Sequence, residues 1–218
     1  AGMVAAPSKA WLRQEHAERA LPPSRTPKAL NVSLGVDKLS SAILSGIPEE
    51  RVVLCTRNGQ HIFYEADRFG FNNPDSAYQR PTDILVLGDS FVEGICLEPG
   101  KDLVGRVRAG NPATIGIGSR GSGPLFEVAM LGRYGGYLRP KNVVVAFFEG
   151  NVWENLQQEL KQPYMRQAPA PNPPFGPVEM SPETQKRAES VISSWLSQDS
   201  PGFIQVLQRT RSRRNFGA

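Results

Sequence analysis

Ile84-Leu85-Val86-Leu87-Gly88-Asp89-Ser90 is the stretch that decides the fold, because an apolar run ends there at a glycine and a serine. Four consecutive apolar residues bounded by turn residues are typical of a buried strand. The glycine permits a tight turn, and a helix that begins at the serine would favour developing negative charge through its dipole. We therefore predict a strand over residues 83–87 that presents Ser90 as a candidate nucleophile.

Strand and helix patterns alternate downstream of Ser90. Residues 113–117 predict a short strand before a glycine-rich loop at 118–123, and Pro124–Tyr134 predicts a helix with proline in its first turn. The apolar run Val143–Phe148 favours a central parallel strand. This order predicts an α/β fold with helices on both faces of a parallel sheet. Further helices are expected at 90–94, 101–109 and 151–161.

The segments on either side of this core differ in composition. Arg51–Cys55 and His61–Tyr64 flank an Asn58-Gly59 turn, which predicts a β-hairpin. Residues 1–30 are rich in Ala, Arg and Pro, and predict an arm with one short helix near Trp11. The Pro-rich residues 163–178 predict an extended loop or flap. Helices are expected after two Ser-Pro pairs, Ser181-Pro182 and Ser200-Pro201.

Composition limits the class of protein. The 218 residues are 39% hydrophobic and 21% charged, as in soluble globular proteins. The longest apolar run, Val143–Phe148, is too short to span a bilayer, so no integral membrane segment is predicted. The net charge of +4 is modest, and the arginines at 209–214 are interpreted as a solvated helix end, so no nucleic-acid partner is predicted.

Metal binding is also not predicted. Structural zinc normally needs four cysteine or histidine ligands at suitable spacing. This chain has two cysteines, Cys55 and Cys96, and two histidines, His16 and His61. The cysteines could pair as a disulfide outside the cytoplasm or remain buried thiols inside it.

Three predicted strand ends carry residues suited to ester chemistry. In an open parallel sheet, functional groups gather at the carboxyl ends of the strands. Ser90 offers a hydroxyl and its own N–H, a glycine of residues 116–123 offers a second N–H, and Asn151 offers a side-chain amide. A nucleophile and several donors for an oxyanion are what acyl transfer requires.

The glycine-rich loop also fits another pattern. Gly116-Ile117-Gly118-Ser119-Arg120-Gly121 matches the dinucleotide fingerprint between a strand and a helix. The acidic residue expected about 20 positions later is missing, since that region is Arg139-Pro140-Lys141. We therefore predict no nicotinamide cofactor.

Asp83–Gly94, Ile115–Leu131 and Phe147–Asn151 together resemble three sequence blocks of the SGNH (GDSL-like) hydrolase superfamily. The resemblance covers about residues 50–160 and is closest to bacterial envelope-associated members with a GDSF block and an EGN block. It implies a flavodoxin-like three-layer α/β/α sandwich. The implied activity is hydrolysis or transfer of an acyl ester, such as an O-acetyl group on an envelope carbohydrate, without a cofactor.

The resemblance also implies roles for individual residues. Ser90 would be the nucleophile, Asn151 an oxyanion-binding side chain, and Gly121 the oxyanion N–H donor, with Gly118 and Gly123 as alternates. It further implies a Cys55–Cys96 disulfide and an extracytoplasmic location, periplasmic or secreted. Val152 stands where the family usually has an aspartate, which we expect to remove a structural hydrogen bond.

The family's Asp-x-x-His block, which holds the general base, is not found in this sequence. No histidine follows Ser90, and His16 and His61 are expected to be structural. We favour truncation before that block over a natural pseudoenzyme. The alternative function is a non-catalytic SGNH-like protein that binds a glycan in the same crevice. The sequence leaves the substrate and oligomeric state open.

The expected organisation is a single domain with extensions. Residues 1–50 form an N-terminal arm, residues 51–160 the hydrolase-like core with its leading hairpin, and residues 161–218 the Pro-rich flap and C-terminal helices. Arg120, beside the glycine-rich loop, is either a surface arginine or a holder of an anionic substrate group. Three acids near the expected site, Glu93, Glu149 and Glu154, are interpreted chiefly as solvated residues.

Overall fold

The computed structural model describes residues 20–21, 26–57 and 60–198. Five of the expectations above lie outside these residues. They concern the helix near Trp11, His16, the Asn58-Gly59 turn, the helix after Ser200 and the arginines at 209–214.

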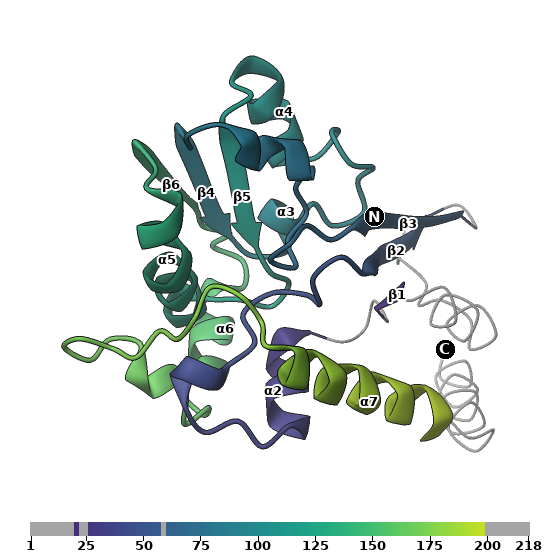
Figure 1. The fold of residues 1–218 in the computed structure, drawn as a ribbon, viewed down its shortest axis with the longest axis vertical. Helices are drawn as coiled ribbons and strands as arrows, with labels where there is room; N and C mark the ends of the chain where they lie inside the picture. Colours follow the sequence, from purple (N-terminus) through teal and green to yellow (C-terminus); the bar gives the residue numbers. More distant parts are fainter. Residues whose placement is uncertain (1–19, 22–25, 58–59, 199–218) are drawn as a thin grey trace, which may run out of the picture.

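A parallel sheet of three strands carries the fold (Figure 1). The strands are β4 (Ile84–Gly88), β5 (Thr114–Gly118) and β6 (Asn142–Ala146), in the order β5-β4-β6. In this register Leu85 lies beside Ile115 on one side and Val143 on the other. The apolar stretch before Ser90 is therefore the middle strand.

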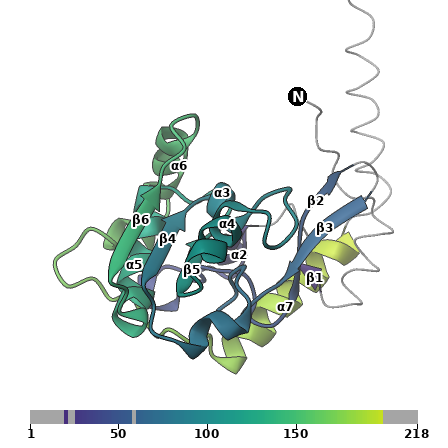
Figure 2. The ribbon, with the colours of Figure 1, turned by 90° about the horizontal axis from the view of Figure 1, so that it is seen from above.

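Helices cover both faces of the sheet, as Figure 2 shows. The helix α5 (Pro124–Leu138) packs on the face that carries Leu85 and Leu87. Val86 points to the opposite face and packs against α3 (Ser90–Glu93) and α4 (Leu103–Gly110). Because side chains alternate along a strand, one apolar run supplies both interfaces. The predicted α/β class is confirmed.

β6 differs from its expectation as a central strand. Among the described residues it pairs with β4 alone and forms the edge of the sheet. Val143, Val144 and Val145 are 44%, 48% and 40% exposed. The strand has the apolar residues on both faces that a central parallel strand needs, but the described chain covers neither face fully.

The opposite edge of the sheet, at β5, is covered by side chains. The Asn73 amide donates to the Gly116 carbonyl at 2.8 Å and accepts from the Gly116 N–H at 2.8 Å. Arg108 Nε donates to the Thr114 carbonyl at 2.9 Å. The Asp67 carboxylate accepts from Asn73 and holds it in place. The outward N–H and C=O of Gly116 and the C=O of Thr114 are thus already hydrogen-bonded.

The predicted antiparallel hairpin is present. It consists of β2 (Arg51–Arg57) and β3 (Gln60–Glu65), with a register shift between Val53 and Cys55, and β1 (Ala20–Leu21) pairs parallel with β2. Cys55 forms a disulfide with Cys96, their Cα atoms 5.4 Å apart. This bond joins the hairpin to the segment that follows α3.

Chain segments before the hairpin pack into the core of the protein. In α2 (Pro27–Ser33), the fully buried Asn31 exchanges two hydrogen bonds of 2.8 Å with the backbone of Ile43. The Arg133 guanidinium of α5 donates to the carbonyls of Leu39 and Ala42. Leu39 begins a 3-10 turn, η1 (Leu39–Ser41). Residues 27–47 are therefore tied to the sheet through α5.

The segments that follow β6 also pack against α5 and α2. The helix α6 (Val152–Glu159) leads to η3 (Met165–Gln167), where Met165 is fully buried. Phe175, in the Pro-rich stretch, lies directly over Gly132 of α5, where a Cβ would come within 2.2 Å of its ring. The long helix α7 (Pro182–Gln198) packs against α2 through Ala188 and Ile192. None of the described helices is long and apolar enough to cross a membrane.

We predict that the disulfide contributes strongly to stability. It closes a loop with a sequence separation of 41 residues. Constraining such a loop in the unfolded chain corresponds to about 4 kcal/mol. The Cys55→Ser/Cys96→Ser variant should lose up to about that free energy of unfolding in urea. A native chain whose mass does not change by two hydrogens on reduction would contradict the bond itself.

Candidate functional site

Ser90 occupies a tightly determined turn between β4 and α3. Asp89 caps the helix, and its carboxylate accepts a hydrogen bond of 2.9 Å from the Phe91 N–H. The preceding Gly88 has no room for a side chain, since a Cβ would lie 2.5 Å from Val92 and 2.9 Å from the Ala146 carbonyl oxygen. The half-buried Ser90 is therefore held at the carboxyl end of the middle strand.

Asn151 lies at the same edge of the sheet. It is the residue before α6, and its side-chain amide donates to the Asp89 carboxylate over 3.4 Å. The ends of β4 and β6 therefore meet as expected, and the contact is made by Asp89, the residue next to Ser90. The sequence distance of 62 residues is bridged because the two strands are parallel neighbours.

The glycine-rich loop is anchored to the same turn. The Ser119 N–H and the Ser122 hydroxyl both donate to the Gly88 carbonyl, at 3.3 and 3.1 Å. The Asn155 amide of α6 donates to the Ser122 carbonyl at 2.8 Å. All three sequence blocks thus come together around the end of β4.

The three candidate glycines have different surroundings. The Gly123 N–H is already donated to Glu159 at 2.5 Å. Gly118 lies against α3, where a Cβ would come within 2.5 Å of the Glu93 nitrogen. Gly121 has a φ of +75°, is half-buried, and its N–H makes no hydrogen bond within the described residues. The nearest atoms to a Cβ there belong to Lys28 and Thr26.

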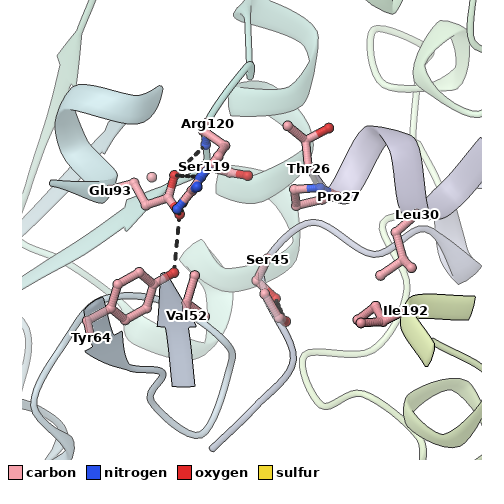
Figure 3. A pocket seen from close by; sticks show the side chains of 12 residues that line it. Thr26, Pro27, Leu30, Ser45, Val52, Tyr64, Glu93, Ser119, Arg120 and Ile192 are labelled. Carbon is pink, nitrogen blue, oxygen red and sulfur yellow. Dashed lines mark hydrogen bonds and ion pairs between the residues drawn. The ribbon is translucent and has the colours of Figure 1, made fainter. Parts of the chain in front are cut away.

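Arg120 belongs to a buried ion pair, which differs from both sequence interpretations. Its side chain is 10% exposed, and its Nη2 lies 2.7 Å from the Glu93 carboxylate, which is itself 6% exposed. The Tyr64 hydroxyl donates to the same carboxylate at 3.3 Å, and Arg120 Nη1 donates to the Val53 carbonyl. Figure 3 shows Tyr64 and Arg120 meeting at Glu93. Glu93 is therefore not a solvated acid.

The pocket in Figure 3 is lined by Glu93, the last residue of α3, but not by Ser90. Its wall is formed by α2, the hairpin, the glycine-rich loop and α7. Among the candidate catalytic groups, the alternate oxyanion donor Gly118 lines this pocket, whereas Ser90, Gly121 and Asn151 do not.

Buried carboxyl groups near the site were not found from the sequence. Burial, together with nearby Glu159 and Asp89, raises the pKa of Glu127 to about 7. Its Oε2 atom is buried without a hydrogen-bond partner in the described structure. Burial also raises the pKa of Glu159, whose carboxylate accepts from the first N–H groups of α5, and lowers that of Lys28. The signal was available, since Glu127 shares a helix face with the buried Met130 and Tyr134.

Three exposed aromatic side chains come from the segments next to Ser90 and Asn151. Phe91 and Phe148 stand with ring centroids 4.8 Å apart and are 50% and 45% exposed. Trp153, in the first turn of α6, is 70% exposed. The rim of the site is therefore apolar and open.

A general base for Ser90 is not found in the described residues. The Ser90 hydroxyl makes no hydrogen bond there, and of His61 only the backbone, in β3, is described. No group of three or more His, Cys, Asp or Glu side chains in the described part of the chain could hold a metal ion.

Comparison with protein-family models, curated proteins and solved structures finds no match for this chain.

We predict that removing only one partner of the Glu93–Arg120 pair strongly lowers the free energy of unfolding. Arg120→Met would leave the Glu93 carboxylate buried without its cation, at about 3–5 kcal/mol of unfolding free energy. The Glu93→Gln/Arg120→Met double variant should be clearly more stable than that single variant.

The control is Arg68→Met, which breaks the exposed pair with Asp75 and should cost less than about 1 kcal/mol. Urea unfolding of all four proteins measures the differences. Equal losses for Arg120→Met and Arg68→Met would contradict a buried role.

Because the pKa of Glu127 is raised in the folded protein, we predict that the free energy of unfolding falls as pH rises. Its pKa is about 7 in the folded protein and near 4.5 in the unfolded chain, so the folded state holds its proton longer. Unfolding free energy therefore falls between about pH 4.5 and 7. Glu127→Gln should remove about 1–2 kcal/mol of that fall.

The measurement is urea unfolding at pH 5 and pH 8, with the exposed Glu154→Gln as a control for the loss of one charge. Parallel pH profiles for the native chain and Glu127→Gln would show that Glu127 does not titrate in this window.

Proposed function

We propose that the Ser90 turn is the acyl-transfer site of an SGNH-type serine ester hydrolase. The observation that carries the proposal is the meeting of three distant sequence blocks at one strand end. Asp89 binds Asn151, and Gly88 binds both Ser119 and Ser122. The resemblance assigns the nucleophile and oxyanion donors to these blocks.

The sheet supports the finer assignment of the fold. When the three strands β4, β5 and β6 are numbered 1, 2 and 3 along the chain, they lie side by side in the order 2-1-3, and helices cover both faces. A doubly wound sheet of flavodoxin type begins with this order. We therefore propose a flavodoxin-like three-layer sandwich.

In the proposed reaction, Ser90 Oγ attacks the carbonyl carbon of an acyl ester, the ester C–O bond breaks, and the alcohol leaves with the proton taken from Ser90. Water then hydrolyses the acyl-Ser90 ester and releases the acid. The negative charge that develops on the carbonyl oxygen is stabilised by the Gly121 N–H and the Asn151 amide. The Asp89 carboxylate accepts a hydrogen bond from that amide and thereby orients it. The proton of Ser90 requires a base, and no residue after Ser90 in this sequence is a histidine. The acyl group is proposed to be an O-acetyl group on an envelope carbohydrate.

The disulfide supports a location outside the cytoplasm. Disulfides persist in oxidising compartments such as the periplasm. Cys55 and Cys96 are joined in this protein. We propose a periplasmic or secreted protein on that basis.

Binding of a glycan without catalysis is the second candidate. Two observations favour it: the sequence offers no histidine after Ser90, and exposed aromatic side chains border the site. Aromatic faces such as that of Trp153 can pack against the apolar faces of sugar rings.

Acetylation of Ser90 tests the proposal. The native chain is incubated with an aryl acetate and with imidazole as the missing base, and peptide mass spectrometry locates the acetyl group. We expect acetyl-Ser90 to accumulate with increasing imidazole. Asn151→Ala should slow its formation by roughly a hundredfold, the typical effect of losing one oxyanion donor.

The control is Ser76→Ala, an exposed serine of η2 (Asp75–Gln79), which should behave like the native chain. Acetyl groups found only on other residues, equally in Ser90→Ala, would contradict the catalytic proposal. Calorimetric binding of an O-acetylated oligosaccharide without acetylation of Ser90 would favour the second candidate.

A further inference from the structure

A pocket of about 230 Å³ lies between α5, residues 40–45 and residues 177–181. Three of its lining residues are polar and at least nine-tenths buried, namely Ser45, Arg133 and Tyr134, which are 3%, 9% and 3% exposed. The volume is many times what a single water molecule needs. Neither Ser90 nor Asn151 lines this pocket, so it is distinct from the candidate catalytic site.

Arg133 brings a positive charge to this pocket without an acidic partner. Its guanidinium donates to three backbone carbonyls, and the Tyr134 hydroxyl accepts a further hydrogen bond; the carbonyls are those of Leu39, Ala42 and Phe175. These partners carry dipoles but no net charge. No described carboxylate forms an ion pair with Arg133, in contrast to Arg120, which Glu93 neutralises. Burial lowers the pKa of Arg133, but a guanidinium stays protonated at neutral pH.

The other charged groups near the pocket do not cancel this charge. Among the described lining residues the acidic one is Glu179, which is exposed, so water and salt screen it far more than they screen the buried Arg133. Thr184, in the first turn of α7, also lines the pocket, and the N–H groups of such a turn carry partial positive charge. Glu183, the acid in that turn, does not line the pocket. The electrostatic potential in the pocket is therefore positive.

We propose that this pocket binds a small oxyanion, a phosphate or carboxylate group, as the counter-ion of Arg133. A buried charge is stable when an opposite charge accompanies it, and the described chain does not supply one. The hydroxyl groups of Ser40 and Thr184 line the pocket and can donate hydrogen bonds to the anion. A bound anion would join three segments that are distant in sequence: residues 40–45, α5 and the start of α7. The proposal does not depend on the ester chemistry of Ser90.

Thermal unfolding of the native chain gives the first test. Sodium phosphate and sodium acetate are each compared with sodium chloride at equal ionic strength and pH 7. A ligand that binds only the folded state raises the unfolding midpoint. We expect a rise of roughly 5–10 °C at an oxyanion concentration of a hundred times its dissociation constant. A rise in phosphate alone or in acetate alone identifies which of the two groups the pocket takes.

Charge variants in the pocket give the second test, with phosphate affinity measured by calorimetry. Arg133→Met would also remove the carbonyl contacts and can unfold the protein, so Arg133 itself is left unchanged. Glu179→Gln removes a negative charge and should tighten binding roughly two- to fivefold. Ser40→Asp adds a negative charge and should weaken binding roughly tenfold. The matched control, Glu154→Gln, changes an exposed acid of α6 that does not line the pocket and should leave the affinity unchanged.

Three outcomes would overturn the proposal. The first is an equal unfolding midpoint in phosphate, acetate and chloride. The second is a phosphate affinity that is the same in Glu179→Gln, Ser40→Asp and the native chain. The third is a change in affinity for Glu154→Gln as large as that for Glu179→Gln, since the anion would then respond only to the net charge of the protein.

Discussion

The buried carboxylate of Glu93 is the constraint on which the site depends. It accepts hydrogen bonds from the backbone and side chain of Arg120 and from Tyr64. Glu93 is the last residue of the helix that begins at Ser90, so its carboxylate connects this helix to the glycine-rich loop and to the hairpin. A charge in this environment is stable only while its partners stay in place. The position of the loop relative to Ser90 is consequently fixed by electrostatics as well as by chain connectivity.

Buried polar contacts perform a similar role elsewhere in the molecule. Arg133 binds carbonyl groups of Leu39, Ala42 and Phe175, so α5 holds both the N-terminal segment and the Pro-rich stretch. The Asn31 side chain bonds both the N–H and the C=O of Ile43, as the backbone of a neighbouring strand would. These segments have no strand of the main sheet, and single side chains complete their backbone hydrogen bonding. The cost of leaving such groups unpaired explains why irregular segments adopt one arrangement.

Much of the fold could be predicted because its signals are local. The apolar run before Ser90, the proline at the start of α5 and the strands of the hairpin each reflect neighbouring residues. The meeting of Asn151 with Asp89 followed from the rule that parallel strands end at the same edge. The disulfide came only from the family resemblance, since spacing alone left two possibilities.

The rest depends on contacts between distant segments. Glu93 lies in the first turn of a helix, like the solvated Glu154, yet it is buried because Arg120 and Tyr64 reach it from other parts of the chain. Arg120 could not be assigned because its partners Glu93 and Val53 come from elements far apart in the chain. The apolar composition of β6 predicted burial on both faces, but composition does not identify the strand that provides it.

The covered edge at β5 has a consequence for how this sheet can grow. A sheet that can accept a new strand at both of its edges can grow without limit, as in a fibril. Here Asn73 and Arg108 occupy one side of the sheet, so growth is possible at β6 alone. Within the described residues, the sheet can therefore gain a further strand in one direction only, beside β6.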